Sequence, residues 1–267
     1  MFKIRAALTP QQRWLFGGIA IALCVALWVG LTASGAVSSS TLPGPGDLYE
    51  VFPKMYAERY MVNNALVSLL RITIGFALAT AVAVPVGILM GAFTPIRAMI
   101  SPLIGPLRFL PIAAVVPIFI FWFGLGEEMK IALLFIGTFV YLLPLVVETV
   151  DQVDEVYLKT ASTLGASRLQ TITTILVPAS MPAIYEALRV LYGIGWTYVM
   201  LAEFVSEADS GFGYSGIGYL INNLRRYGTL SEVLVAVGLI LLLGVLVDLL
   251  LGFIGDMLFP WVEKKKR

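Results

Sequence analysis

The sequence predicts an all-α membrane protein with six transmembrane helices, from three observations. Hydrophobic residues make up 59% of the chain and charged residues only 13%, about half the charged share of an average soluble domain. The mean hydropathy is +0.90. Six apolar segments also approach or exceed the length of about 20 residues that a helix needs to cross a bilayer. Because 18 basic and 17 acidic residues cannot cover a soluble domain of this size, an ordinary cytosolic enzyme and a disordered chain are excluded.

The six predicted spans form one transmembrane domain over residues 14–258, between an N-terminal segment (1–13) and a basic tail (259–267). The spans are 14–31, 65–90, 107–125, 131–147, 187–204 and 233–251. The first span follows three basic residues and precedes Ala33-Ser-Gly-Ala, so a cleaved signal peptide is an alternative there. Its apolar run is long for a signal peptide.

The distribution of basic residues predicts that both termini are cytoplasmic. With the N-terminus inside, the inner segments contain eleven lysines and arginines and the outer segments contain five. The inner ones are Lys3, Arg5, Arg13, Arg97, Arg108, Lys159, Arg168 and the four residues 264–267; the outer ones are Lys54, Arg59, Lys130, Arg225 and Arg226.

Two outer loops, 34–63 and 206–230, follow from this topology. Residues 47–60 have apolar residues at helical spacing and predict a surface helix with Asp47 as its N-cap. That helix either contacts a partner or the membrane interface, or it simply lies on the bundle. The second loop is rich in glycine, but no lysine follows the glycines, so it is not a phosphate-binding loop.

The inner segment 151–182 is the most polar stretch and predicts two short helices. Asp154 and Glu155 suit the first turn of one helix, and Gly165 suits its C-terminal end. Ser167 and Gln170 have the spacing of a capping box that starts the second helix, and Pro178 and Pro182 are expected to close the segment. Its apolar residues need a partner or a place on the membrane surface.

The same segment resembles the "EAA" signature of permease subunits of binding-protein-dependent ATP-binding-cassette (ABC) importers. The signature is E-A-A, three residues, Gly, nine residues, then I-x-L-P. This chain has Lys159-Thr160-Ala161, Gly165 and Ile175-Leu176-Val177-Pro178 at matching spacing. Lysine replaces the glutamate, threonine the first alanine and valine the leucine.

Further stretches resemble the nitrate/sulfonate/taurine branch of these permeases, and the resemblance covers roughly 41–258. The stretches begin at Asn64, at Pro106 (Pro-Leu-Arg-Phe-Leu-Pro), at Phe121 (Phe-Trp-Phe-Gly-Leu-Gly-Glu), at Leu164 (Leu-Gly-Ala-Ser-Arg) and at Leu188, with Glu203 after the last. Each match alone is weak, but together they are specific.

The resemblance implies a type I importer permease fold in a bacterial inner membrane. It implies a second permease copy, most simply an identical one, two cytoplasmic ATPases and a periplasmic or lipid-anchored binding protein. The chain has no Walker motif, so it is expected to be non-catalytic, with ATP and Mg²⁺ on the ATPases. The residues expected to contact an ATPase are Lys159, Thr160, Ala161, Leu164, Gly165, Ala166, Ser167, Ile175 and Pro178. The branch implies a small anion such as nitrate, bicarbonate, a sulfonate or taurine; a pyrimidine or an aromatic acid is the alternative.

Ionisable and aromatic residues in the spans are candidates for the translocation pathway. They are Arg71, Phe121, Trp122, Arg189, Trp196, Tyr198 and Glu203. Each has a structural alternative. Arg71 attracts an anion, snorkels to the outer interface or pairs with Glu203. Arg189 has Glu186 at i−3, and Phe121 and Trp122 suit an aromatic belt.

Two other classes are disfavoured. A secondary transporter would show internal repeats and acids at the midplane, and an intramembrane enzyme would need a nucleophile with a base or a metal cluster. The chain has no histidine and one cysteine, Cys24, so it lacks the residues for such a site. Its net charge of +1 predicts no nucleic-acid contact. Membrane lipid is the expected contact of the spans.

Overall fold

The computed structural model describes residues 9–205 and 212–262, and every regular element in these ranges is a helix. The all-α prediction is therefore confirmed for this part of the chain. The long helices are α1 (Pro10–Ala33), α3 (Met61–Ala92), α6 (Glu127–Asp151), α9 (Val177–Phe204) and α11 (Leu230–Leu258). The short ones are α2 (Pro45–Ala57), α4 (Thr94–Ile104), α5 (Ile112–Phe123), α7 (Glu155–Thr163), α8 (Arg168–Thr171) and α10 (Ile217–Tyr227).

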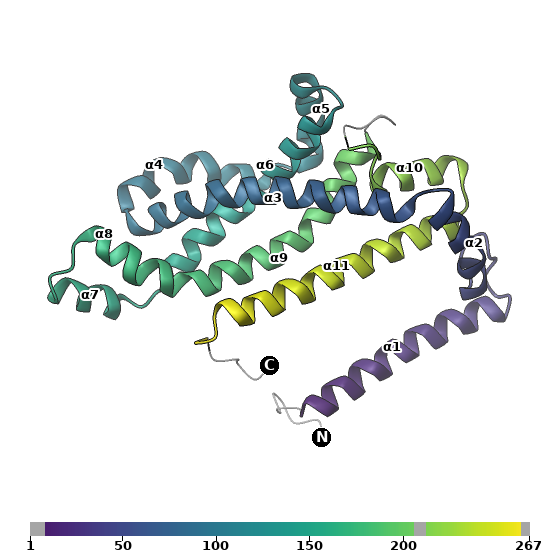
Figure 1. Ribbon diagram of the computed structural model, residues 1–267, viewed down its shortest axis with the longest axis horizontal. Helices are drawn as coiled ribbons and strands as arrows, with labels where there is room; N and C mark the ends of the chain where they lie inside the picture. Colours follow the sequence, from purple (N-terminus) through teal and green to yellow (C-terminus); the bar gives the residue numbers. More distant parts are fainter. Residues whose placement is uncertain (1–8, 206–211, 263–267) are drawn as a thin grey trace.

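The long helices run along the longest axis of the molecule (Figure 1). Helices α3, α6 and α9 pack together as the core, and α11 lies along α9 and α3. Helices α7 and α8 lie at one end, which we call the hairpin end, and α2 and α10 lie at the opposite end. The start of α1 and the end of α11 both point toward the hairpin end, in keeping with termini on the same side as segment 151–182.

Small residues allow α3 and α6 to approach closely. A Cβ added at Gly75 would come 2.5 Å from Leu134 Cβ, and one added at Gly87 would come 2.6 Å from Val146. Buried aliphatic residues of α3, α6 and α9 fill the hairpin end of this contact, among them Ala83, Leu142 and Ile184. Because apolar side chains gain little by leaving lipid, such close backbone packing is what holds membrane helices together.

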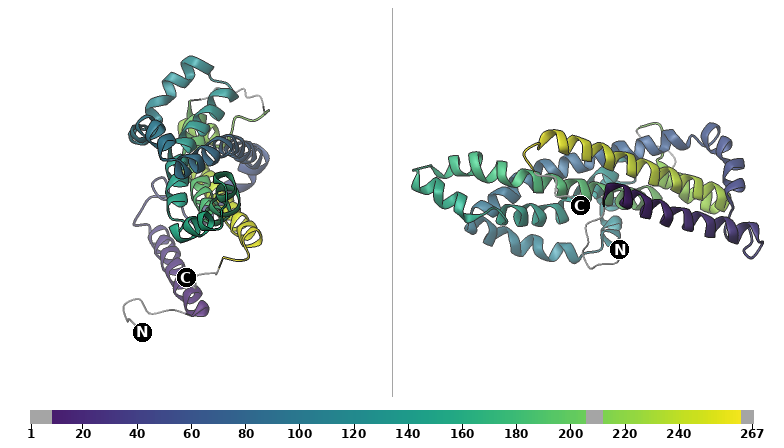
Figure 2. Two further views of the ribbon diagram at one scale, coloured as in Figure 1. Left: turned by 90° about the vertical axis from the view of Figure 1, so that its left-hand side faces the viewer. Right: turned by 90° about the horizontal axis from the view of Figure 1, so that it is seen from below.

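Helix α1 lies apart from the bundle (Figures 1 and 2), and none of its apolar stretch is buried within the chain. It begins with a capping box that Thr9 and Gln12 form. At its other end Trp28 Nε1 donates a hydrogen bond of 3.0 Å to the carbonyl of Pro43.

The span expected over 107–125 is broken. Helix α4 and a short 3₁₀ turn (Gly105–Phe109) form one limb, and α5 forms the other, with an angle of 104° between them. The break falls at Leu110 and Pro111, which have extended backbones with ψ of 118° and 123°. Pro111 has no N–H to continue the helix and forces the residue before it out of the helical region. Within residues 9–205 and 212–262, five helices are therefore long and apolar enough to cross a membrane, or six if this bent pair counts as one span.

Three other expectations need correction. The N-cap of α2 is Gly44, whose N–H donates to Asp47 at 2.8 Å, so Asp47 occupies the third helical position. Pro178 and Pro182 do not close the inner segment, because both lie in α9, which continues from α8 through a π-helical stretch (Ile172–Leu176). The glycine-rich outer loop contains α10; its residues 206–211 lie outside the described part.

The structure supports the second interpretation of the helix at 47–60, namely that it lies on the bundle. Met55 is fully buried in a cluster with residues of α3 and α11, and Lys54 forms an ion pair of 2.8 Å with Glu232. Tyr49 and Tyr56 remain exposed, so one face of α2 still has no partner in this chain.

Candidate functional site

The helical hairpin of residues 154–176, at the far end of the molecule (Figure 1), has the local structure that its sequence predicts. Asp154 caps α7 by accepting a hydrogen bond of 2.9 Å from the N–H of Val156. Ser167 and Gln170 form the expected capping box of α8. Between the helices Gly165 has φ of +76°, the left-handed conformation that favours glycine.

Two hydrogen bonds complete the turn at Gly165. Its N–H donates to the carbonyl of Ser162 at 3.1 Å, and the next N–H, of Ala166, donates to Ala161 at 3.0 Å. This pair of bonds is the Schellman motif, which gives partners to carbonyls that the helix end leaves free. The turn between the helices is therefore set by local chemistry and depends on a residue that tolerates positive φ.

The hairpin presents apolar side chains with nothing over them in this chain. Leu164 is 81% exposed and Leu169 is 70% exposed. Ala161 is buried, while Lys159, Thr160, Ser167 and Pro178 are exposed and Ala166 and Ile175 are half-buried. Exposed leucines at the tip of a projecting hairpin are typical of a surface that contacts a partner or a membrane. Lys159 does not face an external acid here, because it pairs with Glu155 one turn earlier at 2.7 Å.

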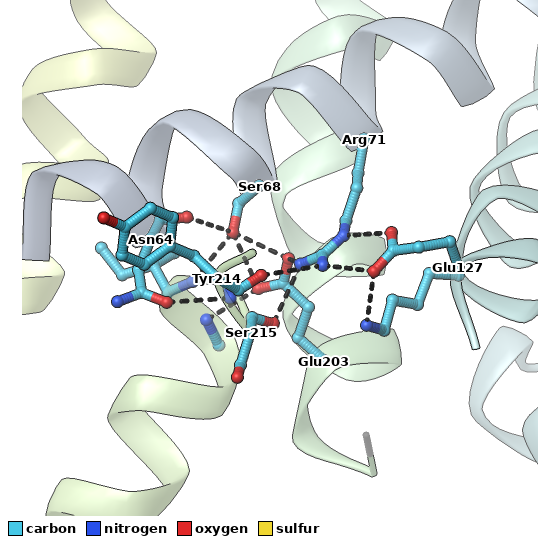
Figure 3. Close-up of polar contacts among 11 residues, drawn as sticks. Asn64, Ser68, Arg71, Glu127, Glu203, Tyr214 and Ser215 are labelled. Carbon is cyan, nitrogen blue, oxygen red and sulfur yellow. Dashed lines mark hydrogen bonds and ion pairs between the residues drawn. The ribbon is translucent and has the colours of Figure 1, made fainter. Parts of the chain in front are cut away.

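A second site is a group of four charged residues that joins α3, the start of α6 and the end of α9 (Figure 3). Arg71 of α3 contacts Glu203 of α9 at 2.6 Å and Glu127 of α6 at 2.5 Å, and Lys130 contacts Glu127 at 2.9 Å. Arg71, Lys130 and Glu203 are fully buried. Two positive and two negative groups balance, which is the condition for burying charges in a membrane protein.

Every N–H of the Arg71 guanidinium has an acceptor. The Nε and one terminal nitrogen hold Glu127 with two bonds, and the other terminal nitrogen donates to Glu203. The two remaining N–H groups donate to the carbonyls of Ser215 at 2.9 Å and Tyr214 at 3.3 Å. Since a guanidinium has five donors, none is left for a solute. Of the sequence interpretations of Arg71, the structure contains the pairing with Glu203.

Residues 216–218 of the glycine-rich outer loop hydrogen-bond to residues of the same group and to their neighbours on α3. Gly218 N–H donates to Glu203 at 2.8 Å, Ile217 N–H donates to Ser68 at 2.9 Å, and Gly216 N–H donates to Asn64 at 3.0 Å. Ser68 in turn donates to the Glu203 carboxylate at 2.8 Å. Gly216 has φ of +100°, and a Cβ there would overlap both Glu203 and Arg71. The network therefore joins α3, α6 and α9 to the start of α10.

Sequence reasoning missed Asn64, Ser68, Glu127 and Lys130 as members of this network. Lys130 was expected in an outer segment, yet it lies buried in the first turn of α6. The sequence did contain one signal for this network, namely Glu127. It ends the Phe121-Trp-Phe-Gly-Leu-Gly-Glu stretch and lies between the predicted spans 107–125 and 131–147. A buried arginine bound by two carboxylates needs a second cation for balance, and no sequence pattern shows which lysine supplies it.

The other pathway candidates have different positions. Arg189 holds Asp248 of α11 with two bonds of 2.6 and 2.7 Å. The expected pair with Glu186 is also present, but at 3.9 Å it is the longer contact. Trp196 is buried in the core cluster of α3, α9 and α11, and Tyr198 packs over Gly137 of α6. Phe121 and Trp122 project from α5, 88% and 67% exposed, and their role in the pathway stays a prediction.

The fold defines a multi-span membrane protein with a helical hairpin projecting at one end. Residues 83–267 match the family described as binding-protein-dependent transport system inner membrane component. The chain is 35% identical over 209 residues to a putative ABC transporter permease of Methanocaldococcus jannaschii, covering 77% of this chain and 75% of the relative. It is 28% identical to the taurine transport system permease of Escherichia coli, covering 97% and 93%.

Two further comparisons agree. A bicarbonate transport system permease of Synechococcus elongatus is 29% identical, covering 83% of this chain and 81% of the relative. Among solved structures, the MetNI methionine ABC transporter in an inward-facing form superposes with a TM-score of 0.64 at 18% identity, covering 80% of this chain and 99% of that chain, which shows the type I permease fold alone.

This chain belongs to the family of inner-membrane permease components of binding-protein-dependent transport systems. It is therefore a multi-pass permease subunit of an ABC importer, a class that works with ATPase and substrate-binding protein partners. Membership of this family favours a transport permease over the two other classes considered, a secondary transporter and an intramembrane enzyme.

Proposed function

We propose that this permease forms, as a homodimer, the pathway for a small anion of the sulfonate, taurine, nitrate or bicarbonate type. The observation that carries the choice of substrate is the pair of relatives whose names specify taurine and bicarbonate transport. Both substrates are small and carry a negatively charged oxyanion group. An importer for a pyrimidine or an aromatic acid is the second candidate, because the resemblance to the nitrate/sulfonate/taurine branch also allows these substrates.

The homodimer is supported by surfaces that this chain leaves uncovered. None of the apolar stretch of α1 is buried, and α5 carries exposed aromatic residues at its tip, Phe121 and Trp122. A second copy would cover part of both. Native mass spectrometry of the purified complex tests this: two copies of the 29.0 kDa chain are expected, and one copy beside a different permease would contradict it.

ATP hydrolysis belongs, in this proposal, to two partner ATPases that hold ATP and Mg²⁺. The hairpin of residues 154–176 is the part of this chain that contacts them, because its exposed leucines at 164 and 169 need a protein surface. The contact residues are those of the EAA-like segment, Lys159 to Ser167 with Ile175 and Pro178 near the base of the hairpin. Closure of the ATPase pair would then move the hairpin, and α9 would transmit the movement into the bundle.

The substrate is tested by uptake into proteoliposomes that contain the permease, its ATPase and its binding protein. We expect ATP-dependent uptake of at least one of taurine, an alkanesulfonate, bicarbonate or nitrate, and no uptake of uracil. Uptake of uracil or benzoate alone would favour the second candidate. A complex without ATP is the matched control, because an ABC importer requires hydrolysis for accumulation.

A further inference from the structure

Arg108 lies at the break between α4 and α5, and its depth in the molecule follows from one hydrogen bond. The hydroxyl of Tyr141 donates to the backbone carbonyl of Arg108 at 3.2 Å. Tyr141 is 14 residues from the first residue of α6 and 10 residues from the last, or about 21 and 15 Å at the helical rise. The break is therefore beside the middle of a membrane-spanning helix, and Arg108 does not lie at an inner membrane surface as its sequence position suggested.

Irregular backbone at this depth does not face lipid. Its peptide groups need partners that hydrocarbon does not supply, so such segments occur only against protein or along a water-filled cavity. In this chain residues 106–110 are all exposed, with Phe109 at 76%. The face of the break that they form must therefore meet water or the other subunit of the complex.

Arg108 differs from the other arginines that line or cross the spans. Arg71 has two carboxylates, Arg97 pairs with Asp151 at 2.6 Å, and Arg189 pairs with Asp248 at 2.6 Å. Within residues 9–205 and 212–262, no carboxylate lies within ion-pair distance of Arg108; its guanidinium sits over the Phe109 ring, 4.9 Å from the centroid. A guanidinium at mid-membrane depth is stable only with water or an anion beside it.

The space beside Arg108 is large enough for a small solute. A cavity of about 400 Å³ lies between the α4 limb and α6, lined among others by Arg97, Ser101, Arg108, Pro144 and Glu148. The acids there do not neutralise Arg108: Asp151 already holds Arg97, and Glu148 lies two turns of α6 from Tyr141, about 10 Å along the helix.

We propose that Arg108 lines the water-filled translocation pathway and pairs with the anionic group of the substrate as it crosses. This inference rests on the proposed import of a small anion and assigns the residue that receives it. It also explains why the fully bonded Arg71 is not needed for that purpose.

The first test is the accessibility of position 108 to water. In a Cys24→Ser background, which removes the one cysteine, Arg108→Cys is placed in the complete complex in proteoliposomes and treated with hydrophilic charged methanethiosulfonates. We expect modification at 108 in at least one nucleotide state. Tyr49→Cys on α2, 82% exposed, is the reactive control, and Leu241→Cys on the apolar face of α11, 70% exposed, is the unreactive one. An Arg108→Cys as unreactive as Leu241→Cys overturns the inference.

The second test restores the charge. We expect Arg108→Cys to lower ATP-dependent anion uptake at least about tenfold, and an aminoethyl methanethiosulfonate, which attaches an ammonium group, to restore most of it. The sulfonatoethyl reagent, which attaches an anion of similar size, should not. Arg108→Lys should keep most of the uptake and guards against a folding defect of the cysteine variant.

The two hypotheses fail in different ways. If the Cys24→Ser parent imports none of the anions, the proposed substrate class is wrong and pairing at Arg108 falls with it. If the parent imports an anion and Arg108→Cys does so equally well, or if both reagents restore uptake equally, only the role of Arg108 is overturned.

Discussion

Arg71 Nη1 donates a hydrogen bond of 2.6 Å to Glu203, a residue 132 positions later in the chain, and both side chains are fully buried. This bond joins α3 to α9, and the second carboxylate, Glu127, joins both to the start of α6. Arg71 and Glu203 have no exposed side-chain surface, so water does not readily replace a lost partner of either. The network therefore holds three helices together, and its loss should lower the stability and the yield of the purified complex as well as transport.

Arg71→Met should destabilise the purified permease by about 3–5 kcal/mol, because it leaves the fully buried Glu203 carboxylate without a cation while Glu127 keeps Lys130. Thermal unfolding in detergent and the yield of complex measure this. The double variant Arg71→Met with Glu203→Met should be less destabilised than the sum of the single variants, since Lys130 and Glu127 remain as a neutral pair. A stable Arg71→Met that loses only transport would contradict the structural role.

Gly216→Ala should disrupt the same network through sterics. Its Cβ would overlap the Glu203 carboxylate, and its φ of +100° is unfavourable for alanine. Gly213→Ala is the matched control, because Gly213 has φ of +79° with open space around it and should lose only about 1–2 kcal/mol of backbone energy. Equal unfolding temperatures for the two variants would show that crowding at Glu203 is unimportant.

Asp248→Asn should have a small effect compared with changes at Glu203. The Arg189–Asp248 pair has side chains that are 27% and 55% exposed, and ion pairs with this exposure contribute about 0–1 kcal/mol. Glu186, 3.9 Å from Arg189, remains as a second acid. The unfolding temperatures of Asp248→Asn and Glu203→Gln are measured side by side. Equally low values would mean that the Arg189–Asp248 pair is more shielded from water than the chain alone indicates.

Gly165→Asp should uncouple ATP hydrolysis from transport while the chain still inserts in the membrane. The left-handed φ of +76° at this turn costs a non-glycine residue about 1–2 kcal/mol, so the angle between α7 and α8 shifts. The ratio of solute imported to ATP hydrolysed in proteoliposomes reports the effect. Ser162→Ala, on the exposed side of α7, is the control. Normal transport by a Gly165→Asp complex that retains its ATPase would refute the docking assignment.

Lys159→Glu, which restores the residue usual in the EAA signature, should weaken α7. It places two acids at i and i+4, where like charges cost about 0.2–0.5 kcal/mol, and removes the 2.7 Å bond to Glu155. The double variant Glu155→Lys with Lys159→Glu should recover ATPase binding, measured by co-purification. Binding by the double variant that is no stronger than binding by Lys159→Glu would show that the lysine at 159 itself contacts the ATPase.

The pH dependence of this pair has a definite sign. The hydrogen bond from Lys159 lowers the pKa of Glu155, so the pair stabilises α7 above the ordinary glutamate pKa of about 4.3 and loses this as the pH falls through the lowered pKa. The pKa of Lys159 is raised by the same bond, so the alkaline loss begins only above its ordinary value. Helicity of an isolated 151–170 peptide should therefore be flat near neutral pH and fall in acid.

The caps and the turn of the hairpin were predicted because their structure is local, but the end of its second helix was not, because α8 continues into α9. Asp154, Gly165 and Ser167 act on backbone groups within four residues of themselves, so their order in the chain is sufficient information. The break at residues 110 and 111 was only partly predictable. Pro111 marks an interruption, but the sequence does not set the 104° angle, which depends on how α5 packs on α6.

Sequence alone determined the membrane class, the approximate spans, the hairpin and the resemblance to ABC importer permeases, because hydropathy, capping and motif spacing are properties of neighbouring residues. Tertiary structure alone decided which charges meet. Arg71 acquired Glu127 and Glu203, Arg189 acquired Asp248, and Arg108 was left at mid-span without an acid in the described chain. The physical reason is that partners at such depth are chosen by helix packing and by the cost of an unpaired charge, and both depend on residues far apart in sequence.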